Sequence, residues 1–261
     1  MRFRRWRALV ALCVVFGAAL PPISVQAFQP LITDDTGTQG AGGNQLEGSF
    51  ARTDATNVTR AAGAVYTRGV TDALDAFIGL THLRRSSADA TTEDGWSNSS
   101  LGAKWRFFDD EQGKLSFALR PELQLPVSAG KEARGLGAAR TSWRLDLLLT
   151  QKTGFGTLHA NLASSRVIFN DAGNNDAIRR SLYRLSVAPV WNLTGQWKLA
   201  LDTGIVTNPD RAQKARMGYL ELGAIYSPSK DLEFALGAIR NYGSGPANAT
   251  QLTAGVTWRF R

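Results

Sequence analysis

The sequence is poor in the two residue types that most often carry redox and metal chemistry. Its 261 residues include 1 cysteine, Cys13, and 2 histidines, His82 and His159. A single cysteine excludes an intrachain disulfide and a cysteine-based zinc site. Two histidines argue against a histidine-rich metal site. We therefore expect no cofactor and no bound metal.

Long apolar runs are also scarce. The mean hydropathy of −0.18 is too low for a bundle of membrane helices, although it is compatible with a membrane β-barrel, whose strands are half polar. The one clear apolar run, residues 8–20, follows four arginines and precedes Val25-Gln26-Ala27. This order predicts a signal peptide over residues 1–27, with a mature chain from Phe28. An anchoring helix is the alternative, but the run is short for a span of about 20 residues.

The excess of basic residues lies largely in that signal peptide. The whole chain has 30 Lys and Arg against 22 Asp and Glu, a net charge of +8. Removing the four signal arginines leaves 30 − 4 − 22 = +4. Nothing in this charge or its pattern indicates a nucleic-acid partner.

A sustained helical stripe is the next missing feature, and short alternating segments stand in its place. In Lys114–Pro126, leucines and Phe117 alternate with residues that include Arg120 and Glu122. About twelve such segments recur, and many have the roughly 10 residues that a tilted transmembrane strand needs. If the strand register slipped by one residue, the Arg120 side chain would point into the hydrocarbon of the bilayer. This would destabilise the protein by about 2–4 kcal/mol near the midplane. The apolar faces are therefore expected to meet lipid and the polar faces to line the interior.

The connections between these segments alternate in length. The short ones are Thr71–Ala73, Asp109–Gly113, Lys152–Gly156, Thr194–Gln196 and Pro228–Asp231. The longer ones are Thr53–Thr59, Arg84–Gly95, Val127–Thr141, Val167–Ile178, Thr207–Arg216 and Asn241–Ala249. Short turns at one end and long loops at the other are typical of outer-membrane barrels. Large aromatic residues gather at strand ends, as interfacial girdles do. Pro121 and Pro189 interrupt two segments, and we expect bulges there.

These patterns predict an all-β protein: a transmembrane, antiparallel, up-and-down β-barrel of about twelve strands in the bacterial outer membrane. The expected domains are a signal peptide at 1–27, a leader at 28–44 and the barrel at 45–261. The expected partners are outer-membrane lipid, small organic solutes and the outer-membrane assembly machinery.

The start of the mature chain carries a resemblance to a known family. It reads Phe28-Gln29-Pro30-Leu31-Ile32-Thr33-Asp34-Asp35-Thr36-Gly37-Thr38-Gln39-Gly40, followed by Asn44-Gln45-Leu46-Glu47. Together with residues 101–107 and 119–126, it resembles the outer-membrane family named for the meta-pathway of phenol degradation. The resemblance implies a barrel linked, in some members, to uptake of aromatic or other small organic compounds. The chain departs from outer-membrane proteins in general at its end, because Arg261 follows the aromatic Phe260.

Charged residues on the polar faces are the candidate lining of a solute path. They are Lys104, Arg106, Arg120, Glu122, Arg144, Asp146, Lys198, Asp202, Glu233 and Arg259. Opposed charges there could shape a selective path, or they could form ion pairs that hold the wall together and fill the lumen. Because the segment with Arg120 and Glu122 precedes the one with Arg144 and Asp146, the two should pair.

The Gly- and Asp-rich stretch Thr33–Gly43 precedes the first strand. It could fold into the lumen as a plug or constriction, in which case Asp34 and Asp35 join the path, or it could be a flexible or surface-packed leader. These two carboxylates lack the spacing of a calcium loop.

Neither histidine lies in a hydrolase-like motif, so we expect no enzyme activity. His159 lies in Leu158-His159-Ala160-Asn161, and His82 lies beside Arg84 and Arg85. We expect each histidine to be a residue of the barrel wall or of a loop. The sequence therefore favours a passive channel for small organic solutes with a narrow, charged lumen. The alternatives are a barrel with a structural or loop-presenting role and, less favoured, an outer-membrane hydrolase.

Overall fold

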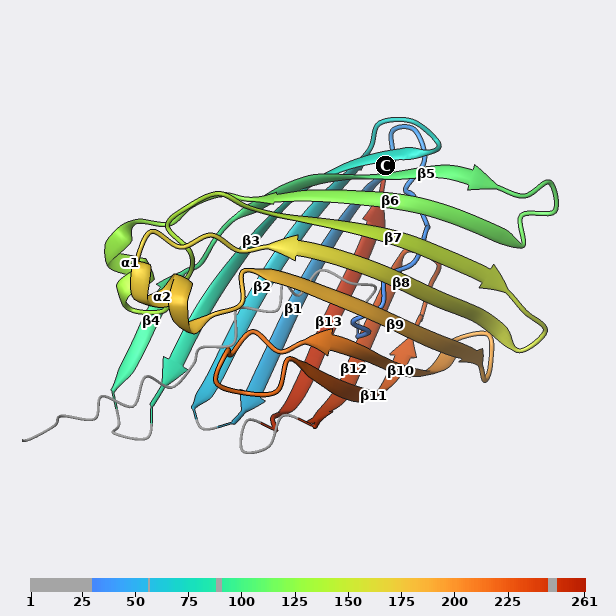
Figure 1. The fold of residues 1–261 in the computed structure, drawn as a ribbon. Coiled ribbons are helices and arrows are strands. Elements are labelled where there is room, and N and C mark those ends of the chain that lie inside the picture. Colours follow the sequence, from blue (N-terminus) through green and yellow to red (C-terminus); the bar gives the residue numbers. More distant parts are fainter. Residues whose placement is uncertain (1–29, 56, 88–90, 244–247) are drawn as a thin grey trace, which may run out of the picture.

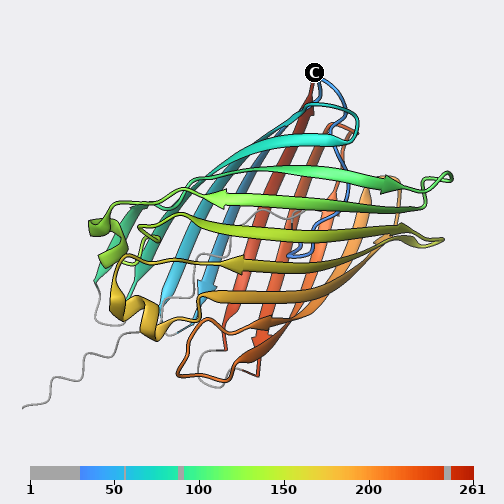
Figure 2. The ribbon, with the colours of Figure 1, turned by 45° about the horizontal axis from the view of Figure 1, so that its top comes forward.

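The chain forms one antiparallel sheet that closes on itself. The computed structural model describes residues 30–55, 57–87, 91–243 and 248–261, so the predicted signal peptide lies outside the described residues. The strand order is β2-β1-β13-β12-β11-β10-β9-β8-β7-β6-β5-β3-β4, and pairing of β2 with β3 closes the barrel (Figures 1 and 2). The strands are β1 Asn44–Asp54, β2 Val58–Gly69, β3 Leu74–Ser86, β4 Thr92–Trp96, β5 Ser100–Asp109, β6 Leu115–Gln124, β7 Ser142–Lys152, β8 Gly156–Arg166, β9 Ser181–Asn192, β10 Trp197–Thr207, β11 Arg216–Tyr226, β12 Leu232–Tyr242 and β13 Thr250–Phe260.

The thirteen strands form a twelve-stranded wall, because β4 and β5 together occupy the place of one strand next to β3. Both pair with β3: β4 lies along residues 82–86 and β5 along residues 74–79. The predicted closed barrel of about twelve strands is therefore confirmed. The prediction that Arg84–Gly95 is all loop was wrong, since β3 continues to Ser86 and β4 begins at Thr92.

The two ends of the barrel differ, as the connection lengths predicted. The helices α1, Ala129–Ala133, and α2, Ala172–Ala177, lie in connections at the end opposite to the C-terminus (Figure 1). One predicted long loop is short: β1 ends at Asp54 and β2 begins at Val58, because the ladder between them continues to the last residue of β1. No helix among the described residues is long and apolar enough to cross a membrane.

The outward face is apolar, as the alternation predicted. Leu147 on β7 pairs with Leu119 and Leu162, and Leu162 pairs with Leu185 on β9. Three of these four leucines are among the exposed large hydrophobic side chains of the molecule. Exposed aromatics occur at both strand ends, and they are Trp105, Trp197 and Trp258 at the short turns and Trp96, Trp143 and Tyr242 at the long loops. A closed barrel with an apolar outer band and several aromatic residues at each end belongs in a bacterial outer membrane.

The two strand prolines do not create the predicted bulges. The β6 register runs through Pro121 without a shift, and the β9 register runs through Pro189 likewise. Cα pairing is interrupted only on the side where each proline would have donated, towards β5 and towards β10. A register shift does occur in β5, between Arg106 and Phe108.

Candidate functional site

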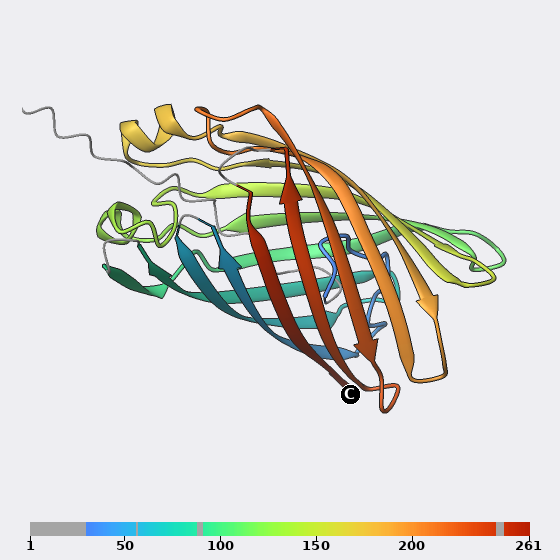
Figure 3. The ribbon, with the colours of Figure 1, turned by 90° about the horizontal axis from the view of Figure 1, so that it is seen from below.

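The segment before β1 enters the interior of the barrel. Figure 3, seen from below, shows this segment, residues 30–43, as the blue trace within the ring of strands. Thr33 is completely buried, and Leu31 and Thr36 are also buried. Leu31 packs with inward residues of β9 and β10, Ala188, Val190 and Ala200. We call residues 30–43 the leader.

The backbone of the leader is held by side chains of the wall. The amide of Thr33 donates to Asp202 Oδ2 at 2.6 Å, and its hydroxyl oxygen lies 2.8 Å from both Asp202 Oδ1 and Ser186 Oγ. Asp202 also accepts the Tyr219 hydroxyl at 2.7 Å. The amide of Ile32 donates to Glu221 at 3.2 Å. These hydrogen bonds satisfy buried polar groups that would otherwise destabilise the segment.

Pro30 sits against two glycines of neighbouring strands. Gly223 on β11 and Gly237 on β12 are directly opposite each other in the sheet. A Cβ on Gly223 would lie 2.5 Å from Pro30 Cγ, and one on Gly237 would lie 2.9 Å from Pro30 Cβ. Only residues without a side chain leave room for the proline at this point of the wall.

Below Thr33, Asp34 joins a buried network of charged side chains. Lys104 Nζ is 3.0 Å from Asp34 Oδ1 and 3.5 Å from Asp35 Oδ1, and Arg120 Nε is 3.5 Å from Asp34 Oδ2. Arg120 also pairs with Glu122 at 3.0 Å, and its guanidinium carbon lies 4.3 Å from the centre of the Phe77 ring. Arg120 is 4% exposed and Glu122 2%, so solvent screens these pairs weakly.

The predicted pairing of β6 with β7 is confirmed and extends this network. Arg120 stands opposite Asp146, and Glu122 stands opposite Arg144. Arg144 binds Asp146 through two hydrogen bonds of 2.7 and 3.0 Å. Asp146 is also 3.8 Å from Arg120 and 3.6 Å from Arg184 of β9, so one carboxylate faces three guanidinium groups.

The remaining candidate residues lie nearer the short turns. Glu233 accepts from Lys198 at 3.2 Å and from Arg259 at 2.6 Å. Arg106 donates to the Asp72 carbonyl at 3.1 Å and lies 3.6 Å from Asp109. The structure therefore places the candidates in three groups: one around Thr33 and Asp202, one around Arg120, and one around Glu233, with Arg106 at the rim.

Cavities lie on both sides of the leader. The outer cavity, about 900 Å³, is at the long-loop end, and its lining includes Ile32, Arg144 and Arg184. The inner cavity, about 290 Å³, is lined by Asp34, Asp35 and wall residues. The two have no lining residue in common among the described residues. The leader and the Arg120 network therefore stand between them. A third cavity, about 610 Å³, lies at the short-turn mouth and shares Glu233 and Arg259 with the inner one.

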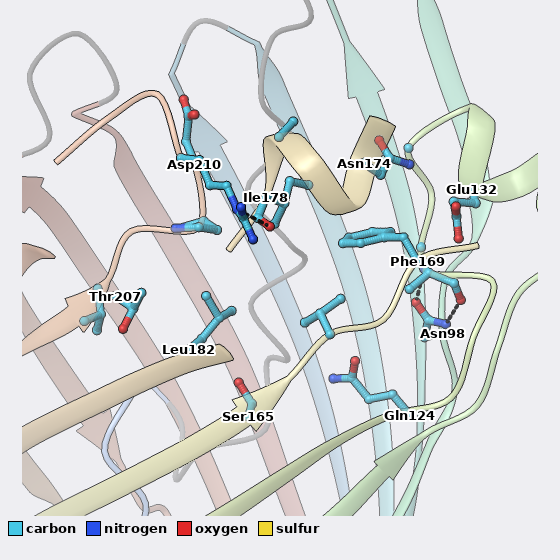
Figure 4. Close-up of a pocket in the computed structure, with 18 of the residues that line it drawn as sticks. Asn98, Gln124, Glu132, Ser165, Phe169, Asn174, Ile178, Leu182, Thr207 and Asp210 are labelled. Carbon is cyan, nitrogen blue, oxygen red and sulfur yellow. Dashed lines mark hydrogen bonds between the residues drawn. The ribbon is translucent and has the colours of Figure 1, made fainter. Parts of the chain in front are cut away.

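The loops over the outer cavity are tied to one another (Figure 4). Buried Glu132 of α1 accepts the amides of Ala139, Asn170 and Asp171 at 2.5, 3.0 and 2.7 Å. Burial alone would raise the pKa of Glu132, but these amides and the Asn174 side chain outweigh it and hold the pKa below its ordinary value. Glu132 thus joins the loop after β6 to the loop after β8.

The other loop contacts come from Arg179 and Asn98. Arg179 donates to the carbonyls of Asn208, Asp210 and Gln213, which join the loop after β8 to the loop after β10. Asn98, in the break between β4 and β5, donates to the carbonyls of Leu125 and Ala138 at 2.7 and 2.8 Å.

Several of these residues were not predicted from the sequence. Tyr219 and Glu221 lie in a segment whose alternation is weak, and Glu132 lies in a loop, where no periodic signal exists. Arg184 alternates with outward residues of its strand, so the pattern could have identified it. His159 is an inward wall residue whose ring nitrogens lie 2.9 Å from the hydroxyls of Thr150 and Thr157. Among the described residues, no group of three or more His, Cys, Asp or Glu is placed to hold a metal.

Fold and lumen define a class of protein, a twelve-stranded outer-membrane β-barrel with a polar, partly filled interior. A family model described as "Putative MetA-pathway of phenol degradation" matches residues 28–260. The chain belongs to this family. Comparison with curated proteins gave no match.

Solved structures share the fold at low sequence identity. The chain is similar to an outer membrane channel from Pseudomonas putida F1, with 14% identity, a TM-score of 0.67, and coverage of 87% of this chain and 98% of that one. It is also similar to the NanC porin, with 9% identity, a TM-score of 0.60, and coverage of 82% and 98%. The KdgM porin in complex with disordered oligogalacturonate matches with 9% identity, a TM-score of 0.54, and coverage of 83% and 99%.

Proposed function

We propose that the protein is an outer-membrane channel for the passive uptake of small organic solutes, including aromatic ones. The observation that carries the proposal is the lumen itself, which holds charged side chains and cavities in place of a packed apolar core. The barrel is narrower than the 16–18-stranded porins with open aqueous channels. The sequence has no motif for energy coupling, so solutes move down their concentration gradient.

In this proposal the leader is the constriction. It lies between the outer and inner cavities, and Asp34 and Asp35 reach the inner one. The charged residues around Arg120 and Glu233 then line the path next to the leader, and they also hold the wall together. The family match and the similarity to porins support a channel. Lipid surrounds the barrel, and we propose that the outer-membrane assembly machinery inserts it.

Purified protein in planar bilayers tests the proposal. We expect small, discrete conductance steps, and swelling of liposomes in small organic solutes but not in large sugars. Asp34→Ala removes a carboxylate that holds Lys104 and Arg120, and we expect it to raise the conductance. Asp54→Ala is the matched control, because Asp54 is exposed and pairs with Arg52 at the end of β1. A barrel that passes neither ions nor solutes, with or without Asp34, would exclude a channel.

A barrel without transport is the second candidate. The separation of the outer and inner cavities by a hydrogen-bonded leader favours it. It predicts no conductance and tolerance of lumenal substitutions such as Arg120→Ala. An enzyme is not proposed, because the inward histidine, His159, is held between two threonine hydroxyls of the wall.

A further inference from the structure

The outer cavity has an apolar side and a cationic side. Phe169 and Ile178 lie on the loop side of the cavity and Leu182 on the barrel wall (Figure 4). The cationic side is formed by Arg144 and Arg184, whose strands β7 and β9 flank β8. A volume of about 900 Å³ is within the range of small-molecule sites.

Arg184 has donors that the protein does not use. Its side chain is 11% exposed, yet its Nε and one terminal nitrogen have no hydrogen-bond partner among the described residues. The nearest carboxylate oxygen, on Asp146, is 3.6 Å away, and Asp146 is already bound by both hydrogen bonds from Arg144. Buried guanidinium donors without hydrogen-bond partners destabilise the protein unless an anion binds to them.

The acidic groups around the cavity do not bind Arg184 within the described part of the chain. The Glu132 carboxylate accepts three backbone amides, and the Asp171 carboxylate caps α2 by accepting the Asn174 amide at 2.9 Å. Asp210 accepts the Ala212 amide at 2.8 Å, and Asp176 is exposed in α2. None of these carboxylates is hydrogen-bonded to Arg184 among the described residues, and Arg184 is itself one of the residues that line the cavity.

We propose that the outer cavity binds a small organic monoanion, with its carboxylate on Arg184 beside Arg144 and its apolar body against Phe169, Ile178 and Leu182. A guanidinium group binds a carboxylate through two parallel hydrogen bonds. Arg184 Nε and one terminal nitrogen are unpaired but buried, so the side chain must turn toward the cavity for this pair to form. This inference rests on the proposed channel and names the solute class for the same path. Aromatic carboxylates, of which benzoate is the simplest, have this chemistry.

Calorimetry on the detergent-solubilised protein tests the inference. Benzoate should bind saturably and at least about tenfold more tightly than neutral phenol, because a phenol cannot form the charge-assisted pair. Arg184→Gln should weaken benzoate binding by about tenfold and leave phenol unchanged. Arg166→Gln is the matched control, since Arg166 is exposed at the end of the neighbouring strand β8.

The outcomes separate the binding site from the channel. Equal affinity for benzoate and phenol, no benzoate binding, or unchanged binding in Arg184→Gln would overturn the anion site. If Arg184→Gln does not fold, Arg184→Lys keeps the charge but loses the two-pronged donor, and benzoate binding equal to wild type would overturn the site in that variant. Conductance measured on the same preparation reports on the channel alone, so conductance without benzoate binding removes the anion site and retains the proposed function.

Discussion

At the residue scale, the contact of Pro30 with Gly223 and Gly237 predicts how tightly the leader is held. Gly223→Ala places a Cβ 2.5 Å from Pro30 Cγ, and overpacking of this kind costs about 1–3 kcal/mol. The leader can move where the wall cannot, so we expect amide protection of Ile32 and Thr33 to fall by about tenfold to a hundredfold. Hydrogen exchange measures this directly.

Gly195→Ala is the matched control, because a Cβ there has nothing within 4 Å. Unchanged protection in Gly223→Ala would mean that the glycine pair does not position the leader.

Single residues were predictable where strand alternation placed them. Period two put Arg120 and Asp146 on the inner face, and chain order predicted that their strands pair. The contact of Thr33 with Asp202 was not predictable, because the two are 169 residues apart and a leader has no period. Glu221 was missed because glycines at 218 and 223 weaken the alternation of its strand.

At the scale of elements, Glu132 makes the contact between two loops depend on pH. Its pKa in the folded loop lies below the ordinary value of about 4.5, so it stabilises the contact fully above that value. The stabilisation is lost as pH falls through the lower folded pKa. With spin labels at Gly130 and Ala172, we expect a narrow distance distribution at pH 7 that broadens only below about pH 4.5.

Glu132→Gln should broaden that distribution already at pH 7, because hydrogen bonds to a charged acceptor contribute about 1.5–3 kcal/mol each. Glu111→Gln, in an exposed turn at the other end, should behave as wild type. A narrow distribution in Glu132→Gln at pH 7 would show that other contacts hold the loops.

Strands were predicted best within the membrane, because lipid requires an apolar outer face there and the sequence shows it as alternation. The short turns matched because strand ends there are marked by Gly, Pro and Asp. The loops matched less well: β4 extends the hairpin after β3, and β2 follows β1 almost at once. Hydrogen bonding between strands continues beyond the membrane, where polarity no longer distinguishes a strand from a loop.

At the scale of the whole molecule, stability depends on an uninterrupted apolar exterior. Leu147 lies midway along β7 between Leu119 and Leu162, and Leu147→Arg should lower the free energy of unfolding in lipid by about 2–4 kcal/mol. Leu193→Arg, in an exposed turn, should lower it by about 0–1 kcal/mol. Urea titration in vesicles measures both, and equal losses would contradict the assigned lipid face.

The leader lies before the first strand, so the free energy that holds it inside the barrel is separate from the free energy of strand pairing. Its amides at Ile32, Thr33, Thr36, Gln39 and Ala41 donate to side chains of the wall and of the turn after β2, while the ladder of paired strands begins at Asn44. The leader can therefore leave the barrel interior while every strand stays hydrogen-bonded to its neighbours. Thermal or denaturant unfolding curves would therefore measure the stability of the paired strands, and they would not show whether the leader occupies the barrel interior.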